Sequence, residues 1–377
     1  MSINKKKKII YISIFLLILS LLCLNSLFLN QTIEKIFIKD KFIKITSALE
    51  TKIMEHQSLI YCETFQLAWN KFYHILNEPI ILNNPPDYVN FLNKNIKNLS
   101  ILKDSEYVAQ FGFIKDGIVN KINDELIQKF RIGTALSEST LPPNGIILYA
   151  CLSKTFEFRL NFENIEEPFT FKSANGNLSS IASFGLKKNT STDSKKIYQR
   201  KLKNNQVDVC YYDEKQGFII KLYSKTNGEV LTISTVPPLE TLEKTYHQIK
   251  SLCKNSYKRF ILVEDTLQIP KIDFKLSHSF DELLDKCVLN EKLVKKNYFI
   301  AKATQFINFS LNEKGEKSES MGEVDKRSDD SIPISHDYIV NGPFIIYLTD
   351  IFNDESDLEE PPYFMMYIGN DDLLVKK

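Results

Sequence analysis

Side chains that commonly carry out chemistry are scattered along this chain. The five histidines are His56, His74, His247, His278 and His336, and the six cysteines are Cys23, Cys62, Cys151, Cys210, Cys253 and Cys287. No two cysteines have the CxxC spacing of a metal or redox site, and no histidines follow a cysteine pair at zinc-finger spacing. The motifs of serine hydrolases, metallopeptidases, phosphate-binding loops and dinucleotide-binding folds are also missing from the sequence. We therefore predict no metal and no cofactor. An enzyme is the weaker hypothesis, although a catalytic triad assembles in space rather than along the chain.

The cysteines have a structural explanation. Cys151, Cys210 and Cys287 lie in apolar or strand-like sequence, for which buried free thiols are the simplest prediction. Disulfides stay open as an alternative, because an exported chain would meet an oxidising compartment.

The N-terminal thirty residues differ from the rest of the chain. Four lysines at 5–8 precede an uncharged apolar run at 9–29. About 20 apolar residues can cross a bilayer as a helix, and the lysines before them would hold the N-terminus in the cytoplasm. We predict an uncleaved signal anchor in residues 1–30, with the C-terminal domain tethered outside the cytoplasm. A cleaved signal, which would give a secreted protein, and a buried helix are the alternatives.

Apolar periodicity predicts helices mainly in the first half of the chain and strands in the second. Helical spacing covers residues 62–76, with the single Trp69 in the core, and also residues 32–56, 86–96, 115–130 and 239–255. Short or alternating apolar runs bounded by turn residues predict strands within 145–160, 167–173, 178–186, 207–213, 217–225, 230–238, 267–280 (broken at Pro270), 298–311, 338–348 and 363–370. This order predicts an α+β fold, with residues 31–377 as a single domain.

Charge gives no indication of a polyanionic partner. The 48 basic and 47 acidic residues balance, so nucleic acid is not a predicted partner. The basic stretch at 187–205 and the acidic stretch at 350–362 are predicted to be solvated loops.

One polar stretch interrupts two apolar segments near the C-terminus. Residues 312–324 (NEKGEKSESMGEV) and further charged residues separate the run at 300–311 from the run at 338–348. Nothing in their composition requires a packed structure, so residues 316–335 are predicted to be an exposed loop.

Several segments, in chain order, resemble those of serpins. The matching segments are INDELIQKF at 122–130, the strand and Phe-rich segment at 145–171, the paired strands at 207–238, LQIPKIDFKLSHSFDELL at 267–284, ATQFINFSLNEKGEKSESMGEV at 303–324, YIVNGPFIIYLTD at 338–350 and PPYFMMYIGN at 361–370. Residues 31–110 do not match the family. The FQLAWN start and the GN..LL end are also similar to bacterial proteins of unknown function.

The resemblance implies that the polar stretch is a reactive loop. In inhibitory serpins a protease cuts such a loop, and its hinge then inserts into the central sheet as a new strand. The implied hinge residues are Glu313, Gly315, Glu316, Ser318, Ser320, Gly322 and Val324. The implied scissile region contains Arg327, Ser328, Asp329, Asp330 and Ser331. By loop length the bond lies near Asp329–Ser331, and Arg327–Ser328 is the alternative suited to a trypsin-like protease.

Side-chain alternation within the hinge gives conflicting indications. On one face, Ser318, Ser320, Gly322 and Val324 are small enough for an inserted strand. On the same face, however, Glu316 would enter the sheet first, and burying a carboxylate without a partner costs several kcal/mol. The sequence therefore predicts a membrane-tethered, non-inhibitory binding module. A suicide-type protease inhibitor is the alternative, and an exported enzyme is a further one. The sequence identifies neither the protease or other protein partner nor the oligomeric state.

Overall fold

The fold is defined over most of the chain after residue 41. The computed structural model describes residues 42–96, 102–133, 135–137, 141–187, 206–225, 228–256, 259–261, 265–316, 335–350 and 361–377. Contacts divide the chain into residues 1–44 and a compact unit, residues 45–377, with β1 (Ile43–Thr46) at the boundary. The predicted anchor at 9–29 lies outside the described residues. Among the residues that are described, no helix has the length and apolarity needed to cross a membrane.

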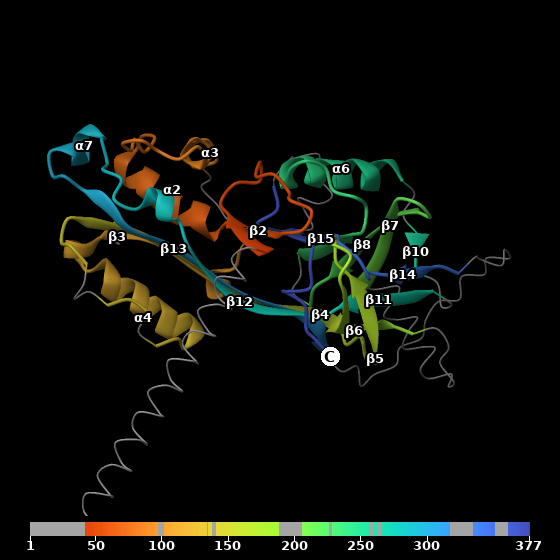
Figure 1. Cartoon of the computed structure of the whole chain (residues 1–377). Helices are drawn as coiled ribbons and strands as arrows, with labels where there is room; N and C mark the ends of the chain where they lie inside the picture. The colour runs from red at the N-terminus through yellow and green to blue at the C-terminus, as the bar shows by residue number, and fades with distance from the viewer. Residues whose placement is uncertain are drawn as a thin grey trace, which may run out of the picture. The chain divides into compact units, whose positions relative to one another are not determined.

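The central sheet of the compact unit contains the strand that leads into the predicted loop. In spatial order its strands are β12 (Ile272–Ser279), β13 (Phe299–Glu316), β4 (Gly145–Leu160) and β3 (Tyr107–Phe113). The two central strands, β13 and β4, are parallel neighbours, and both outer pairs are antiparallel. Figure 1 shows these strands running side by side.

Helices cover both faces of this central sheet. Trp69 and Phe72 of α2 (Thr64–Leu76) pack on one face, in a core that includes Ala303 of β13. Ile122 and Leu126 of α4 (Ile118–Phe130) pack on the other face, so α2 and α4 lie on opposite sides in Figure 1. Both helices have apolar residues three and four positions apart, which explains why each buries one stripe.

Two further sheets complete the unit. The larger contains, in spatial order, β2 (Ser58–Cys62), β16 (Phe364–Ile368), β15 (Phe344–Asp350), β9 (Glu229–Ser234), β8 (Gly217–Tyr223), β7 (Val207–Asp213) and β10 (Arg259–Phe260). The smaller contains β14 (Asp337–Ile339), β11 (Thr266–Pro270), β6 (Leu178–Leu186) and β5 (Glu163–Lys172). The remaining elements are α3 (Tyr88–Lys94), α6 (Leu242–Asn255), α7 (Glu291–Val294) and the 3-10 turns η1 (Asp104–Glu106), η2 (Ile114–Asp116) and η3 (Asp281–Leu283).

The predicted helix at 32–56 is wrong where the chain is described. Ile43–Thr46 forms a strand, residues 48–56 contain no helix, and the next element is β2. Ile43 and Ile45 alternate with Lys44, which is the period of a strand rather than of a helix. The other four helices and the α+β class are confirmed, and the strand predicted at 267–280 is broken at Pro270 as expected.

Candidate functional site: the base of the loop

Only the base of the predicted loop lies within the described residues. Glu313, Gly315 and Glu316 form the C-terminal end of β13. The rest of the predicted site lies outside the described residues, namely Ser318, Ser320, Gly322, Val324, Arg327, Ser328, Asp329, Asp330 and Ser331.

The end of β13 is paired with β4 up to its last residue. Beyond an irregularity after Leu311, Gly315 lies opposite Phe158 and Glu316 lies opposite Leu160. The Gly315 amide donates to Asn161 Oδ1 at 2.5 Å. The central sheet is therefore closed between β13 and β4, the two strands that an inserting strand would have to separate.

Gly315 is required by the close approach of β4. A Cβ atom added to Gly315 would lie 2.5 Å from the Phe158 carbonyl oxygen and 2.8 Å from the Leu160 carbonyl carbon. Both are backbone atoms, so neither can move away as a flexible side chain would. The two backbones therefore lie close together at the end of the described part of β13.

Glu313 is held by an ion pair next to this point. Lys271, between β11 and β12, places its Nζ 2.5 Å from Glu313 Oε2. Burial alone would raise the pKa of Glu313, but the hydrogen bond and charge of Lys271 leave this pKa below its usual value. The Glu313 carbonyl also accepts a hydrogen bond from the Phe162 amide at 2.9 Å.

Gln305 attaches the middle of β13 to the layer beneath the sheet. This side chain is fully buried, and its Nε2 donates to the Cys62 carbonyl at 3.0 Å and to Thr64 Oγ1 at 2.9 Å. Those two acceptors lie where β2 ends and α2 begins. Also on β13, Asn308 donates to Oγ of Ser153 on the neighbouring strand β4 at 3.0 Å.

The chain re-enters the fold at a different sheet. Residues 337–339 form β14, which runs parallel to β11 in the smaller sheet. The His336 amide donates to Asp265 Oδ1 at 2.7 Å. The His336 imidazole ring stacks on the Tyr212 ring, with the two centroids 4.2 Å apart. The loop is therefore anchored at both ends, on two separate sheets. This arrangement can present a peptide segment to a partner.

A buried charge cluster that the sequence did not predict is centred on β4, the strand next to β13. Lys154 of β4, with a 2% exposed side chain, places its Nζ 2.8 Å from Glu106 Oε1 and 2.6 Å from Glu229 Oε1. Tyr363 also donates to Glu229 Oε1, and burial followed by the Glu229 charge raises the pKa of Tyr363. Lys154 lies on the same face of β4 as the buried Phe156 and Phe158. This alternation in the sequence could have indicated that Lys154 is buried.

The cysteines and other potential ligands form no reactive site in the described part of the chain. Cys62, Cys151 and Cys210 are buried and are not part of a disulfide, whereas Cys287 is exposed, contrary to the prediction for it. Cys287 lies outside the named strands and forms only an isolated bridge with Phe299, so it is not enclosed within a sheet. Burial raises the pKa of Cys62 to about 11. No group of three or more His, Cys, Asp or Glu within the described ranges is arranged to hold a metal ion.

The fold is similar to those of solved serpin structures. Maspin superposes with a TM-score of 0.55 at 10% identity, covering 83% of this chain and 92% of that one. The native thermophilic serpin tengpin gives 0.51 at 12% identity, covering 84% and 90%, and serpin-12 of Manduca sexta gives 0.50 at 12%, covering 83% and 92%. No protein-family model and no curated sequence matches the chain. At such identities the likeness establishes the fold alone.

Proposed function

From the serpin-like fold of this chain we propose that it acts as a protein-binding module that displays residues 317–334, and not as a suicide inhibitor. The observation that carries the proposal is the closed central sheet. Pairing between β13 and β4 continues to Gly315 and Glu316, and Glu313 is held by Lys271 beside it. Insertion of the loop between β13 and β4 would have to break these contacts.

The charge of the loop supports the same proposal. Insertion beyond Glu316 would bring further carboxylates to the sheet, from Glu319, Glu323 and Asp325. By strand alternation Glu319, Glu323 and Asp325 would all lie on the face opposite Ser318 and Ser320 and could face water, so the cost of burying a carboxylate falls on Glu316 alone. Because an unpaired buried carboxylate costs several kcal/mol or becomes protonated, the loop is more stable outside the sheet.

A trypsin-like protease tests the proposal directly. We expect cleavage near Arg327–Ser328 without a covalent complex, so that denaturing electrophoresis shows only the nicked chain and free protease. A band at the summed mass of protease and chain would contradict the proposal and favour the inhibitor. A variant with Arg327 and Lys326 changed to Gln should lose this cut. Any partner recovered with the wild-type chain should be lost when residues 318–331 are replaced by a Gly-Ser sequence.

We also propose that residues 9–29 tether the protein to a membrane, with the compact unit outside the cytoplasm. The apolar length and the preceding lysines support this proposal. The full chain should stay in the membrane fraction after carbonate extraction, and a variant lacking residues 1–30 should be released. Release of the full chain would contradict the tether.

A further inference from the structure

The outer edge of the central sheet is open along β3. In the described part of the chain β3 pairs only with β4, so it is the last strand on that side of the sheet. The Tyr107 carbonyl accepts a hydrogen bond from Lys129 Nζ of α4 at 3.2 Å, so the backbone groups of Tyr107 face away from β4. Because outward and inward residues alternate along an antiparallel strand, the backbone groups of Ala109 and Phe111 also face outward. An edge of this kind can pair with an added strand.

A pocket lies at this open edge. Its volume is about 430 Å³, within the range of roughly 300–1,000 Å³ that ligand sites occupy. Its lining includes Lys71 of α2, Ala109 and Gln110 of β3, and Lys121 of α4. The two helices cover opposite faces of the sheet, and Figure 1 shows β3 between them. Since only the edge of a sheet can be reached from both faces, the pocket follows the edge of β3.

A buried hydrogen-bond acceptor in this pocket has no partner. Gln110 is only 4% exposed, and its Nε2 donates to the Glu125 carboxylate of α4. Its Oε1 has no hydrogen-bond partner among the described residues. An unpartnered buried acceptor costs free energy, so the pocket favours an occupant that carries N–H or O–H donors.

Two lysines flank the edge, one on each face of the sheet. Lys71 and Lys121 are both exposed, and neither ammonium group has an ion-pair or hydrogen-bond partner among the described residues. The third lysine of the lining, Lys129, is already paired with Asp104 at 2.7 Å. Consecutive side chains of a strand point to opposite faces. Two adjacent acidic residues of an added strand would therefore each meet one of the two flanking lysines.

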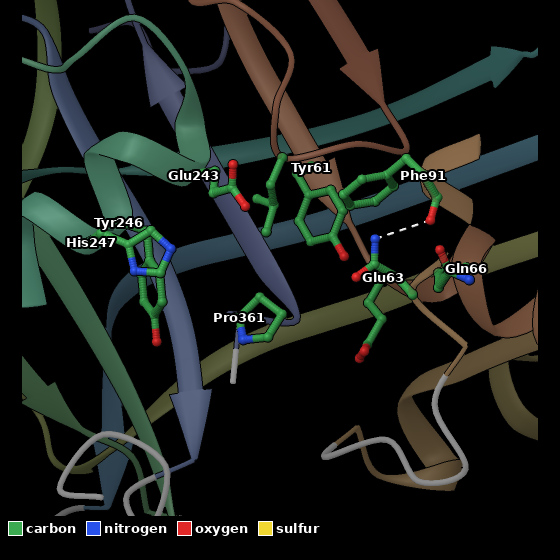
Figure 2. A pocket seen from close by; sticks show the side chains of 10 residues that line it. Tyr61, Glu63, Gln66, Phe91, Glu243, Tyr246, His247 and Pro361 are labelled. Atoms are coloured by element: carbon green, nitrogen blue, oxygen red, sulfur yellow. Dashed lines mark hydrogen bonds between the residues drawn. The ribbon is translucent and has the colours of Figure 1, made fainter. Parts of the chain in front are cut away.

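Another pocket, shown in Figure 2, lacks this selectivity. It lies beside the first turns of α2 and α6 and is lined by Glu63 and Glu243 together with donors such as Tyr61 and His247. Such a mixture selects no class of ligand. The edge of β3, by contrast, combines outward backbone groups with two flanking positive charges.

We propose that the edge of β3 binds an extended peptide that has two adjacent acidic residues. The peptide backbone pairs with the outward groups of Ala109 and Phe111, and its two carboxylates meet Lys71 and Lys121 on opposite faces. A hydroxyl two positions from the residue that meets Lys121 lies on the same face and can donate to Gln110 Oε1.

This surface is separate from the loop. β3 pairs with residues 146–152 of β4, whereas the loop base pairs with Phe158 and Leu160. The test of this proposal is therefore independent of the proposed function.

Fluorescence anisotropy of a labelled peptide with the full-length protein in detergent tests the proposal. The probe is an eight-residue peptide of threonine and valine with two adjacent glutamates at its centre. We expect saturable binding of this probe. Binding should be at least about tenfold weaker when lysines replace the glutamates, or when alternate backbone amides are N-methylated. The N-methylated probe keeps its charge but loses donors for strand pairing, so it separates strand addition from simple attraction of an anion.

Lysine variants locate the binding surface. The double variant Lys71→Gln, Lys121→Gln should weaken binding of the acidic probe about tenfold, since each lost charge pair contributes a factor of a few. The matched control is Lys275→Gln, an exposed lysine on β12, the strand at the opposite edge of the same sheet. It should leave binding unchanged. Absence of saturable binding, equal binding of the lysine or N-methylated probe, displacement of the probe by inorganic phosphate at constant ionic strength, or an equal loss in the control would overturn the proposal.

Discussion

At the scale of a single residue, Gly315 allows the end of β13 to approach the backbone of β4 closely. Gly315→Ala would place a Cβ atom 2.5 Å from the Phe158 carbonyl oxygen, and overpacking of this kind costs about 1–3 kcal/mol. We expect urea unfolding to show a loss of that size.

The matched control for this substitution is Gly133→Ala. A Cβ atom at Gly133 meets no atom of the described residues within 4 Å, so the substitution should change the free energy of unfolding by less than about 0.5 kcal/mol. Neither glycine has a positive φ that an alanine would strain. Equal effects of the two substitutions would mean that the strand end is not packed against β4 in solution.

Residue roles were only partly predictable from the sequence. Glu313 and Gly315 were singled out through a family resemblance, and both lie at the loop base. The partners that fix them, Lys271 and Asn161, are distant in the chain. No local pattern could pair them. The cluster around Lys154 was missed because a lysine in an alternating strand is normally taken as solvent-facing.

At the scale of elements, Lys154 joins β4 to the turn η1 and to β9. Lys154→Met would leave Glu106 and Glu229 without their shared cation. Removing one partner of a buried ion pair costs about 3 kcal/mol or more. We expect the midpoint of urea unfolding to fall accordingly, with the slope unchanged.

An exposed ion pair provides the comparison for that prediction. Lys244 pairs with Glu240 at 2.9 Å, with both side chains more than half exposed. Lys244→Met should cost less than about 0.5 kcal/mol, as exposed helix pairs do. If Lys154→Met lowered the free energy of unfolding by no more than Lys244→Met, the prediction would be wrong, because water would then have to reach Glu106 and Glu229.

Strands with a clear alternation or a long apolar run were predicted well, and so were some short ones, such as β9 and β16, but β2 and β3 were not. β4 was predicted at residues 145–160, the range it occupies. β2 and β3 were missed because a short buried run has no period that separates strand from helix. β2 is held by pairing with β16, some 300 residues away, and such a pairing leaves no trace in local sequence.

At the scale of the whole molecule, the fold extends beyond the segments that revealed it. The recognisable motifs spanned residues 120–370, about two thirds of the chain. The structural likeness to maspin covers 83%, so it includes part of the N-terminal region in which no motif was found. Packing of α2 beneath the central sheet needs only an apolar stripe of suitable volume. Many sequences supply such a stripe, which explains why the fold can be shared where no sequence motif is.

The central claim is that the loop stays outside a closed, stable sheet. It is tested most directly by the melting temperature of the full-length protein before and after a single protease cut within residues 322–333. Our account predicts no increase, because the cut leaves Glu316 and the pairing of β13 with β4 in place. A large increase would contradict it, because that result would mean that the freed segment had inserted between the two strands and that the intact sheet was metastable.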